Sequence, residues 1–266
     1  MVRLMGLSRY IGIVLCIFLS ISCQRVGTLK RQNSKNDTKE GLELPAISSS
    51  EQVIKHVGYT TSYNSTTLNP DWVAYELTID EIQGNLKGKS SFCWDPDVKG
   101  RKSKREDYMN NQGWDKGHMA PKADMKWSVQ AYEESFFLSN ICPQNHDLNA
   151  GDWLKTENLA RRMAEKYQRV YIICGPVFSD LAHGTLGENK VYIPDGFFKA
   201  LMVQAGTSYK SIGFYMSNNA QKNHLRNYAC TVDEIENLIS RDLFTGLDDG
   251  IENSVESTYD LKFWGL

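Results

Sequence analysis

The sequence lacks a surplus of positive charge, because 30 lysines and arginines are set against 32 aspartates and glutamates, for a formal net charge of −2. The protein therefore lacks the overall positive charge that is typical of many nucleic-acid-binding proteins, although a local basic groove can lie on a neutral protein. The 6 cysteines form neither a CxxC pair nor a Cys/His cluster with zinc spacing, so no structural zinc module is indicated. No internal repeat is present, and 266 residues are enough for one sizeable domain with a full hydrophobic core.

Near the start of the chain, the apolar run Tyr10–Ile21 is too short to span a bilayer comfortably. It follows Arg3 and Arg9, an arrangement typical of a secretory signal peptide over residues 1–22. The small residues before Cys23 resemble a bacterial lipobox, and the alternative is an ordinary cleaved signal with an incidental cysteine. We expect an exported protein: a periplasmic or outer-membrane lipoprotein held to the membrane by its N-terminal lipid, or else a secreted protein.

Residues 23–50 are polar and poor in apolar side chains, which predicts a flexible tether. We assign residues 51–266 to one domain. Segments typical of β-strands outnumber helical ones and follow one another directly, which favours an α+β class with a mixed, mostly antiparallel sheet flanked by helices. Strands are expected within 59–64, 72–78, 134–141, 169–178, 191–194, 197–203 and 211–216, and helices within 148–167 and 232–240.

The domain contains four of the cysteines: Cys93, Cys142, Cys174 and Cys230. An exported protein is free to form disulfides, but four cysteines allow three pairings and the sequence does not choose among them. Cys174 lies in an apolar run typical of a strand, so we expect it to be a buried thiol.

Of the 5 histidines in the chain, His118 lies in the densest cluster of unusual residues, Gly113–Pro121. It directly follows a glycine in a turn-rich segment, and Asp115 and Lys116 precede that glycine. An imidazole with a pKa near neutral pH suits general acid–base chemistry, which makes His118 the leading candidate for a reactive group. His56, by contrast, is expected to be structural.

One side of the expected helix at 148–167 carries polar groups at intervals of four residues. Each such step rotates a side chain by only about 40° around the axis, so Asn149, Glu157 and Arg161 can share one side. An amide oxygen, a carboxylate and a guanidinium together suit a hydrated Mg²⁺ ion beside a phosphate. The alternative is an exposed helix face with an ion pair between residues four apart.

Basic residues are concentrated between positions 87 and 105, with Phe92 and Trp94 among them. This segment is either a solvated loop or a rim that faces phosphates and offers aromatic rings for stacking, and the sequence favours neither. The basic residues are Lys87, Lys89, Lys99, Arg101, Lys102, Lys104 and Arg105.

Three segments carry a resemblance to a known family: residues 115–121, residues 140–144, and Leu148–Trp153 with Glu157. Together they are similar to the non-specific DNA/RNA endonucleases, the ββα-metal (His-Me finger) family to which mitochondrial endonuclease G belongs. The likeness extends from about Tyr59 to Trp264. Each motif alone is a weak signal, whereas their combination is specific.

The resemblance implies a ββα-metal fold and a metal-dependent hydrolase that cleaves DNA and RNA to products with 5′-phosphates. His118 matches the general base and Asn149 the one direct protein ligand of Mg²⁺, with Mn²⁺ or another divalent cation as alternatives. Glu157 matches the carboxylate that holds the waters of the metal. Arg161 matches a cation near the phosphate, and Asn140 matches an asparagine that supports the active centre.

Two positions depart from the pattern of the family. Lys116 stands where an arginine is common, and keeps its charge without the bidentate fork. Ser90 stands where an arginine often precedes the Asp-Pro pair, so Lys89 or Lys87 is expected to contact substrate in its place. Two other functions are therefore considered: a catalytically inactive lipoprotein that binds nucleic acids, and a phosphodiesterase for smaller substrates.

Overall fold

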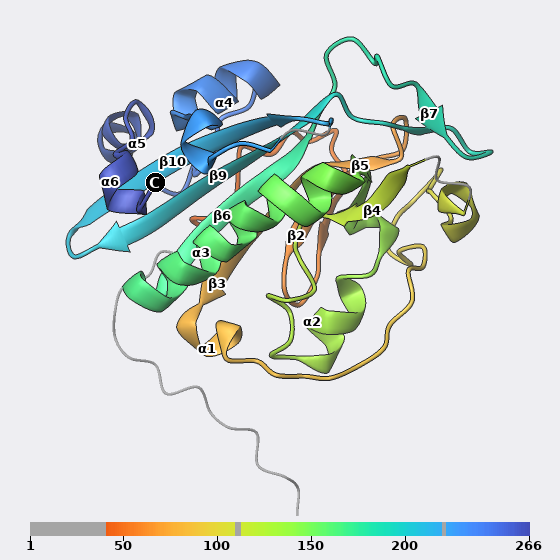
Figure 1. Cartoon of the computed structure of the whole chain (residues 1–266), viewed down its shortest axis with the longest axis horizontal. Helices are drawn as coiled ribbons and strands as arrows, with labels where there is room; N and C mark the ends of the chain where they lie inside the picture. Colours follow the sequence, from red (N-terminus) through yellow and green to blue (C-terminus); the bar gives the residue numbers. More distant parts are fainter. Residues whose placement is uncertain (1–40, 110–112, 220–221) are drawn as a thin grey trace, which may run out of the picture. The chain divides into compact units, whose positions relative to one another are not determined.

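The computed structural model describes residues 41–109, 113–219 and 222–266, which fall within one compact unit. Its framework is a seven-stranded sheet in the order β1-β2-β3-β6-β9-β10-β11, in which each neighbouring pair is antiparallel (Figure 1). The strands are β1 (Val53–Lys55), β2 (Thr60–Asn64), β3 (Asn69–Thr78), β6 (Arg169–Val177), β9 (Gly196–Ala205), β10 (Ser208–Ser217) and β11 (Ala229–Cys230). The sheet and its flanking helices confirm the predicted α+β class.

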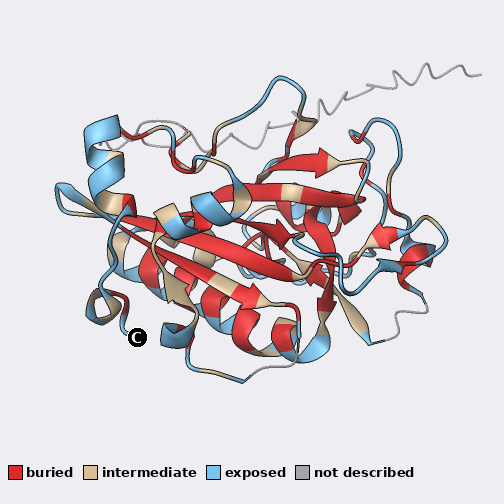
Figure 2. Ribbon diagram, turned by 90° about the horizontal axis from the view of Figure 1, so that it is seen from above, coloured by how far each residue is buried: buried red, intermediate tan, exposed pale blue. Residues whose placement is uncertain are grey.

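Alternation of side chains gives this sheet two buried faces. In β6, Val170, Ile172 and Cys174 pack into one apolar core, while Tyr171 and Ile173 pack into the other. Successive side chains of a strand point to opposite faces, so a strand covered on both sides is a continuous apolar run. Figure 2 shows the central strands buried along most of their length, with exposed residues on the surrounding helices and loops.

A smaller ββα unit covers the first face. It consists of the antiparallel strands β4 (Trp114–His118) and β5 (Ile141–Asn145), the π-helix η3 (Leu148–Trp153) and the helix α3 (Leu154–Tyr167). Helix α3 buries an apolar stripe against the sheet, in the same core as the odd-numbered side chains of β3 and β9. This packing brings the end of β4 close to the start of the helix.

The second face is covered by the helix α4 (Val232–Ile239) and by residues 243–247, whose apolar side chains form the other core. The helix α5 (Asp249–Glu256) lies beside α4 and is tied to β10, since the Ser211 hydroxyl donates a hydrogen bond to the Val255 carbonyl oxygen (2.8 Å; Figure 1). The remaining elements are α1 (Ile79–Ile82), η1 (Arg105–Tyr108), α2 (Val129–Glu134), η2 (Leu138–Asn140), β7 (Thr185–Leu186), β8 (Val191–Tyr192), η4 (Leu225–Asn227) and α6 (Leu261–Trp264).

The domain begins earlier than the sequence indicated. Residues 41–50, which we assigned to the tether, are packed on the second face of the sheet. Leu42 is fully buried in that core, and the Ala46 backbone N–H donates to the Asp242 carbonyl oxygen (2.8 Å). The short apolar stretch around Leu42 is sufficient to anchor this segment, although its composition is otherwise polar.

The N-terminal predictions lie outside the described residues. These are the signal peptide at residues 1–22, the lipidation of Cys23 and the tether up to residue 40. Within the part of the chain that the structure describes, no helix combines the length and the apolar character that a membrane crossing requires. Export and anchoring therefore stay predictions.

Two local predictions can be compared with the structure. The strand expected at 134–141 is wrong for most of its length, because α2 ends at Glu134, η2 spans Leu138–Asn140 and the strand starts only at Ile141. Its apolar side chains are buried from a turn rather than from a strand. The expectation for Cys174 is confirmed: it is a buried free thiol, and all four cysteines of the described domain are unpaired.

Candidate active site

His118 is the last residue of β4, where it pairs with Ile141 of β5. The indole Nε1 of Trp153 donates a hydrogen bond to the His118 carbonyl oxygen (3.1 Å), which ties the strand to the start of α3. Gly117 allows the two strands to approach closely, since a Cβ there would lie 2.2 Å from the side-chain oxygen of Gln144. The Gly-His pair therefore places the histidine on a tightly packed strand rather than in a loose turn.

The His118 imidazole packs against two phenyl rings. Its ring centroid lies 5.4 Å from that of Phe92 and 5.5 Å from that of Phe136. Nε2 is buried and has no hydrogen-bond partner among the described residues. Burial, followed by the positive charge of Lys122, lowers the pKa of His118 from 6.5 to about 3. The imidazole is thus neutral at neutral pH, the state in which it can accept a proton.

Asn140 supports the backbone beyond His118 and has no exposed surface. Its side-chain oxygen accepts from the Ala120 N–H, and its amide nitrogen donates to the Ala120 and Ser135 carbonyl oxygens (2.8, 2.8 and 2.9 Å). The Asn140 carbonyl oxygen also accepts from the Met119 N–H (3.0 Å). These bonds use the whole amide to hold the two residues after His118, so Asn140 is a positioning residue rather than a group that reacts with substrate.

Asn149 is oriented by a carboxylate from the neighbouring strand. Its Nδ2 donates to Oδ2 of Asp115 on β4 (2.9 Å), and the same oxygen lies 2.9 Å from Nδ1 of His146. Because the amide nitrogen is directed at Asp115, the amide oxygen is the atom left to accept from another group. Asp115, which the sequence presented only as a neighbour of the histidine, thus selects which end of the Asn149 side chain is offered.

The helix that carries Asn149 begins as a π-helix, whereas we expected a continuous α-helix. A turn closed by i→i+5 hydrogen bonds rotates less per residue than an α-turn. Eight α-helical residues would offset Asn149 from Glu157 by roughly 80° around the axis, and the π-turn reduces that offset. The irregular start of the helix therefore favours the shared side that the spacing predicted.

Glu157 and Arg161 form an ion pair, with Nη2 of Arg161 3.3 Å from Oε2 of Glu157. The same guanidinium donates to Asp124 through Nε (2.6 Å) and to Asn158 through Nη1 (2.9 Å). Asp124 is fully buried and also accepts from the Tyr75 hydroxyl (3.2 Å). All three guanidinium nitrogens are therefore engaged with the protein, and Arg161 links Glu157 to the buried Asp124.

A buried lysine that sequence reasoning missed acts on the same carboxylate. Burial raises the pKa of Glu157, whereas the charge of Lys199 opposes that rise. Lys199 lies in β9 on the face that is shared with Phe197 and Leu201, has no exposed surface, and places Nζ 4.0 Å from the ring centroid of Trp153. Its amine has no hydrogen-bond partner among the described residues. The signal was present in the sequence, as a lone lysine in an apolar strand.

Lys116 lies two residues before His118 in β4, so the two side chains share a face of the strand. Its Nζ is 5.6 Å from the ring centroids of both Phe92 and Tyr108. The Phe92 ring therefore contacts both His118 and Lys116. Burial lowers the pKa of Lys116.

The basic segment 87–105 adjoins this site through Phe92. Lys89 is exposed and Ser90 is half-buried, so a lysine rather than the serine offers charge at this rim. Further along, Nζ of Lys102 lies 4.4 Å from the ring centroid of Trp94, a residue that is 54% exposed. The segment thus presents exposed cations together with an exposed aromatic ring.

The donor set fits the divalent cation that the resemblance implies. Mg²⁺ prefers oxygen ligands and keeps several waters, so it needs few direct ligands from the protein. Asn149 offers an amide oxygen, and Glu157 offers a largely buried carboxylate whose ionised form is favoured by Lys199 and Arg161. The imidazole of His118 is neutral at neutral pH and remains available for proton transfer rather than ligation.

The sequence model of the DNA/RNA non-specific endonuclease family matches residues 42–250. Mitochondrial nuclease EXOG of Danio rerio is 31% identical over 197 residues, covering 68% of this chain and 57% of that protein. Mitochondrial endonuclease G of Homo sapiens is 29% identical over 188 residues, covering 66% of this chain and 62% of that protein. The crystal structure of an EndoG/EndoGI complex aligns with a TM-score of 0.69 at 24% identity, over 75% of this chain and 88% of that chain.

The aligned region therefore spans less than two thirds of the length of either curated relative. The solved structure shows that the fold is shared, and the family match covers most of the described domain, including His118, Asn149 and Glu157. The resemblance of the sequence motifs is thereby confirmed. This chain belongs to the DNA/RNA non-specific endonuclease family.

Proposed function

We propose that this protein is a metal-dependent, sugar-non-specific endonuclease that hydrolyses phosphodiester bonds in DNA and RNA. The observation that carries the proposal is the arrangement around His118. A neutral imidazole with a free, buried Nε2 ends a strand that is tied, through Trp153 and Asp115, to the helix bearing Asn149 and Glu157. Membership of the family supports the same activity.

In the proposed reaction His118 is the general base. The oxygen of a water molecule forms a bond to phosphorus, the bond from phosphorus to the 3′ oxygen breaks, and the proton of the water passes to the imidazole of His118. The leaving 3′ oxygen takes a proton from solvent, so the products carry a 5′-phosphate and a 3′-hydroxyl. Packing between Phe92 and Phe136 keeps bulk water away from the imidazole and holds it neutral before substrate arrives.

A divalent cation, Mg²⁺ in our proposal, would be held by the Asn149 oxygen with the Glu157 carboxylate near its waters, and would supply Lewis-acid stabilisation of the charge that develops on the phosphate. Asp115 presents the Asn149 oxygen by binding the amide nitrogen. Arg161 acts through Glu157, because its guanidinium is occupied by Asp124, Asn158 and Glu157 itself.

Cations on the substrate side are the next part of the proposal. Lys116 and Lys122 lie around the imidazole, and their charges attract the phosphate to be cleaved. A phosphate placed there would offset the positive charge of Lys122 and raise the pKa of His118, which strengthens the base when substrate is bound. Lys89 and the exposed Trp94 would extend the contact along the nucleic-acid strand of the substrate.

The experiment that tests this function compares three substrates. Purified protein is incubated with plasmid DNA, with a structured RNA and with bis-(p-nitrophenyl) phosphate, each in Mg²⁺ and in EDTA. We expect both nucleic acids to be degraded in Mg²⁺ only. Salt-dependent binding without cleavage would point to an inactive nucleic-acid-binding protein, and release of nitrophenol without plasmid nicking would point to a small-substrate phosphodiesterase.

We also propose that the protein is exported and carries a lipid on Cys23. The support is the sequence alone: two arginines, an apolar run of about a dozen residues and small residues before the cysteine. Globomycin treatment of cells that make the protein should cause unprocessed precursor to accumulate. Unchanged processing under globomycin would contradict lipidation and leave a secreted protein as the alternative.

A further inference from the structure

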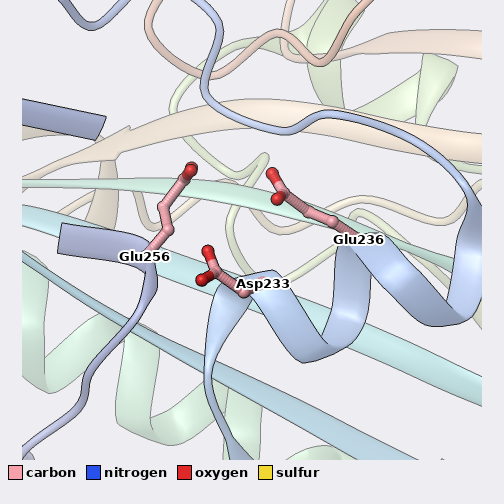
Figure 3. Close-up of side chains that lie close together, drawn as sticks. All are labelled: Asp233, Glu236 and Glu256. Atoms are coloured by element: carbon pink, nitrogen blue, oxygen red, sulfur yellow. The ribbon is translucent and has the colours of Figure 1, made fainter. Parts of the chain in front are cut away.

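Five carboxylates converge between α4 and α5, on the face of the large sheet opposite α3. Asp233 and Glu236 lie three residues apart on α4, Glu252 and Glu256 lie four apart on α5, and Asp242 comes from the connecting segment. Figure 3 shows Glu256 and the two α4 carboxylates directed into one space. One oxygen from each of these three side chains lies within 4.8 Å of the others, and a second trio with the same spacing combines Glu256 with Asp242 and Glu252.

Glu256 is the shared member, and it is buried without a hydrogen-bond partner. Its residue surface is only 3% exposed, and its Oε1 has no hydrogen-bond partner among the described residues. Burying an unsatisfied carboxylate is costly, and the cost falls when a cation or a proton occupies the site. An unsatisfied oxygen on a buried side chain that faces other carboxylates indicates a position meant for a positive charge.

The charged groups acting on Glu256 are acidic. Burial, then Glu236, Glu252, Asp242 and Asp233, raise the pKa of Glu256 to about 9. The basic residue that begins the connecting segment, Arg241, is directed elsewhere, with Nη1 2.8 Å from Oε1 of Glu51. The carboxylates are therefore not neutralised by a side chain that the structure places on them.

We propose that this cluster is a calcium site, in which Glu256 together with Asp233 and Glu236 holds one Ca²⁺ ion while Asp242 and Glu252 complete the negative surroundings. Ca²⁺ takes six to eight oxygens at about 2.3–2.6 Å, so opposite ligands stand about 4.6–5.2 Å apart, which accommodates the observed spacing. Mg²⁺ binds at about 2.0–2.1 Å in a strict octahedron and gives up its waters reluctantly, which suits this set less well. Exposed Asp242 leaves a path for the ion to enter.

The ion would link α4 to α5, two helices that make few direct contacts with each other. Glu236 already fixes the segment after α4, because its Oε1 accepts from the Leu243 N–H (2.7 Å). Calcium bound by Glu236 and Glu256 would join that segment to the end of α5, which in turn is hydrogen-bonded to β10 through Val255. The site is structural and is formed without any residue of the candidate active site.

The test separates this site from any metal at Asn149. Protein freed of metal with EDTA and then dialysed is titrated with CaCl₂ while its melting temperature is recorded, in wild type, in Asn149→Ala, in Glu256→Gln and in Glu165→Gln. Glu165 is an exposed residue of α3 and provides the same change of charge away from the cluster. We expect saturating Ca²⁺ to raise the melting temperature by about 5 °C in wild type, Asn149→Ala and Glu165→Gln.

Glu256→Gln should lose the response to calcium. Without calcium it should melt close to wild type, because a carboxyl group with a pKa of about 9 is already neutral at pH 7, and with calcium it should gain less than about 1 °C. Three results would each overturn the proposal. These are no shift in wild type at about 10 mM free Ca²⁺, a shift that is retained in Glu256→Gln, and a shift that is lost in Asn149→Ala. An equal shift with Mg²⁺ in Asn149→Ala would overturn the choice of calcium.

Discussion

At the scale of single residues, burial decides what His118 can do. Its Nε2 has no hydrogen-bond partner among the described residues, and its surroundings are two phenyl rings and a lysine. Both the rings and the lysine oppose the protonated form, which is why the pKa falls to about 3. The imidazole is thus kept unprotonated. Folding therefore loses free energy at acidic pH, which an exposed histidine would not cause.

We predict that this cost appears as acid sensitivity of the fold. Below pH 6.5 the unfolded chain binds a proton at His118, whereas the folded chain binds that proton only near pH 3. Stability therefore falls as pH is lowered through this window, by about 2 kcal/mol between pH 7 and pH 5. Urea denaturation at both values should show this loss in wild type and a correspondingly smaller loss in His118→Gln. Equal losses in the two proteins would contradict it.

A second prediction concerns Lys199. Its positive charge favours ionised Glu157, so Lys199→Met should raise the pKa of Glu157 and reduce kcat/KM about tenfold near pH 6, with a smaller loss at pH 8. The melting temperature should stay the same or rise, because a buried amine without a hydrogen-bond partner is removed. Lys210→Met, at an exposed position of β10, is the matched control. A parallel loss at both pH values would mean that the lysine acts by packing alone.

Residue identities at the site were predictable to different degrees. His118, Asn149 and Glu157 follow from motifs, because the same chemistry requires the same residue types at fixed spacing. Asp124 and Lys199 were not predicted, since each reaches the site from a different part of the chain. Lys199 also lies in an apolar strand, a pattern typical of the hydrophobic core.

At the scale of elements, the β4–β5 hairpin and the π-turn position the site. The two strands approach so closely at Gly117 that no side chain fits there, and the π-turn at Leu148–Trp153 turns Asn149 toward the side of Glu157. The sequence indicated a helix over this region but gave no sign of its wider first turn. A single extra residue in a turn leaves the apolar pattern nearly unchanged, so periodicity does not reveal it.

Gly117→Ala should therefore disturb the fold locally. The new Cβ would lie 2.2 Å from Oε1 and 2.6 Å from Cβ of Gln144, and relieving that overlap should cost about 1–3 kcal/mol of unfolding free energy. Gly151→Ala in η3, where a Cβ would meet nothing within 4 Å, should lose less than about 0.5 kcal/mol. Chemical denaturation measures the unfolding free energy of both variants. Equal stability of Gly117→Ala and Gly151→Ala would contradict the prediction and show that β4 and β5 separate easily.

At the scale of the whole molecule, a two-faced antiparallel sheet separates the candidate active site from the acidic cluster. The class and the antiparallel character of the sheet were predictable from strands that follow one another directly. The order of the strands was not, because pairings such as β3 with β6 and β6 with β9 join segments that lie far apart in sequence. The start of the domain was also misplaced, since only Leu42 and its neighbours distinguish a packed segment from a polar tether.

The most direct measurement is the rate at which plasmid DNA and RNA are cleaved in Mg²⁺ by wild type and by His118→Ala, with His224→Ala as a control at an exposed histidine. Melting temperatures of the three proteins at pH 7 verify that each is folded. We expect His118→Ala to lose about 10²–10⁴-fold in rate on both substrates, while His224→Ala keeps its activity. A folded His118→Ala protein that cleaves either nucleic acid at the wild-type rate would contradict it.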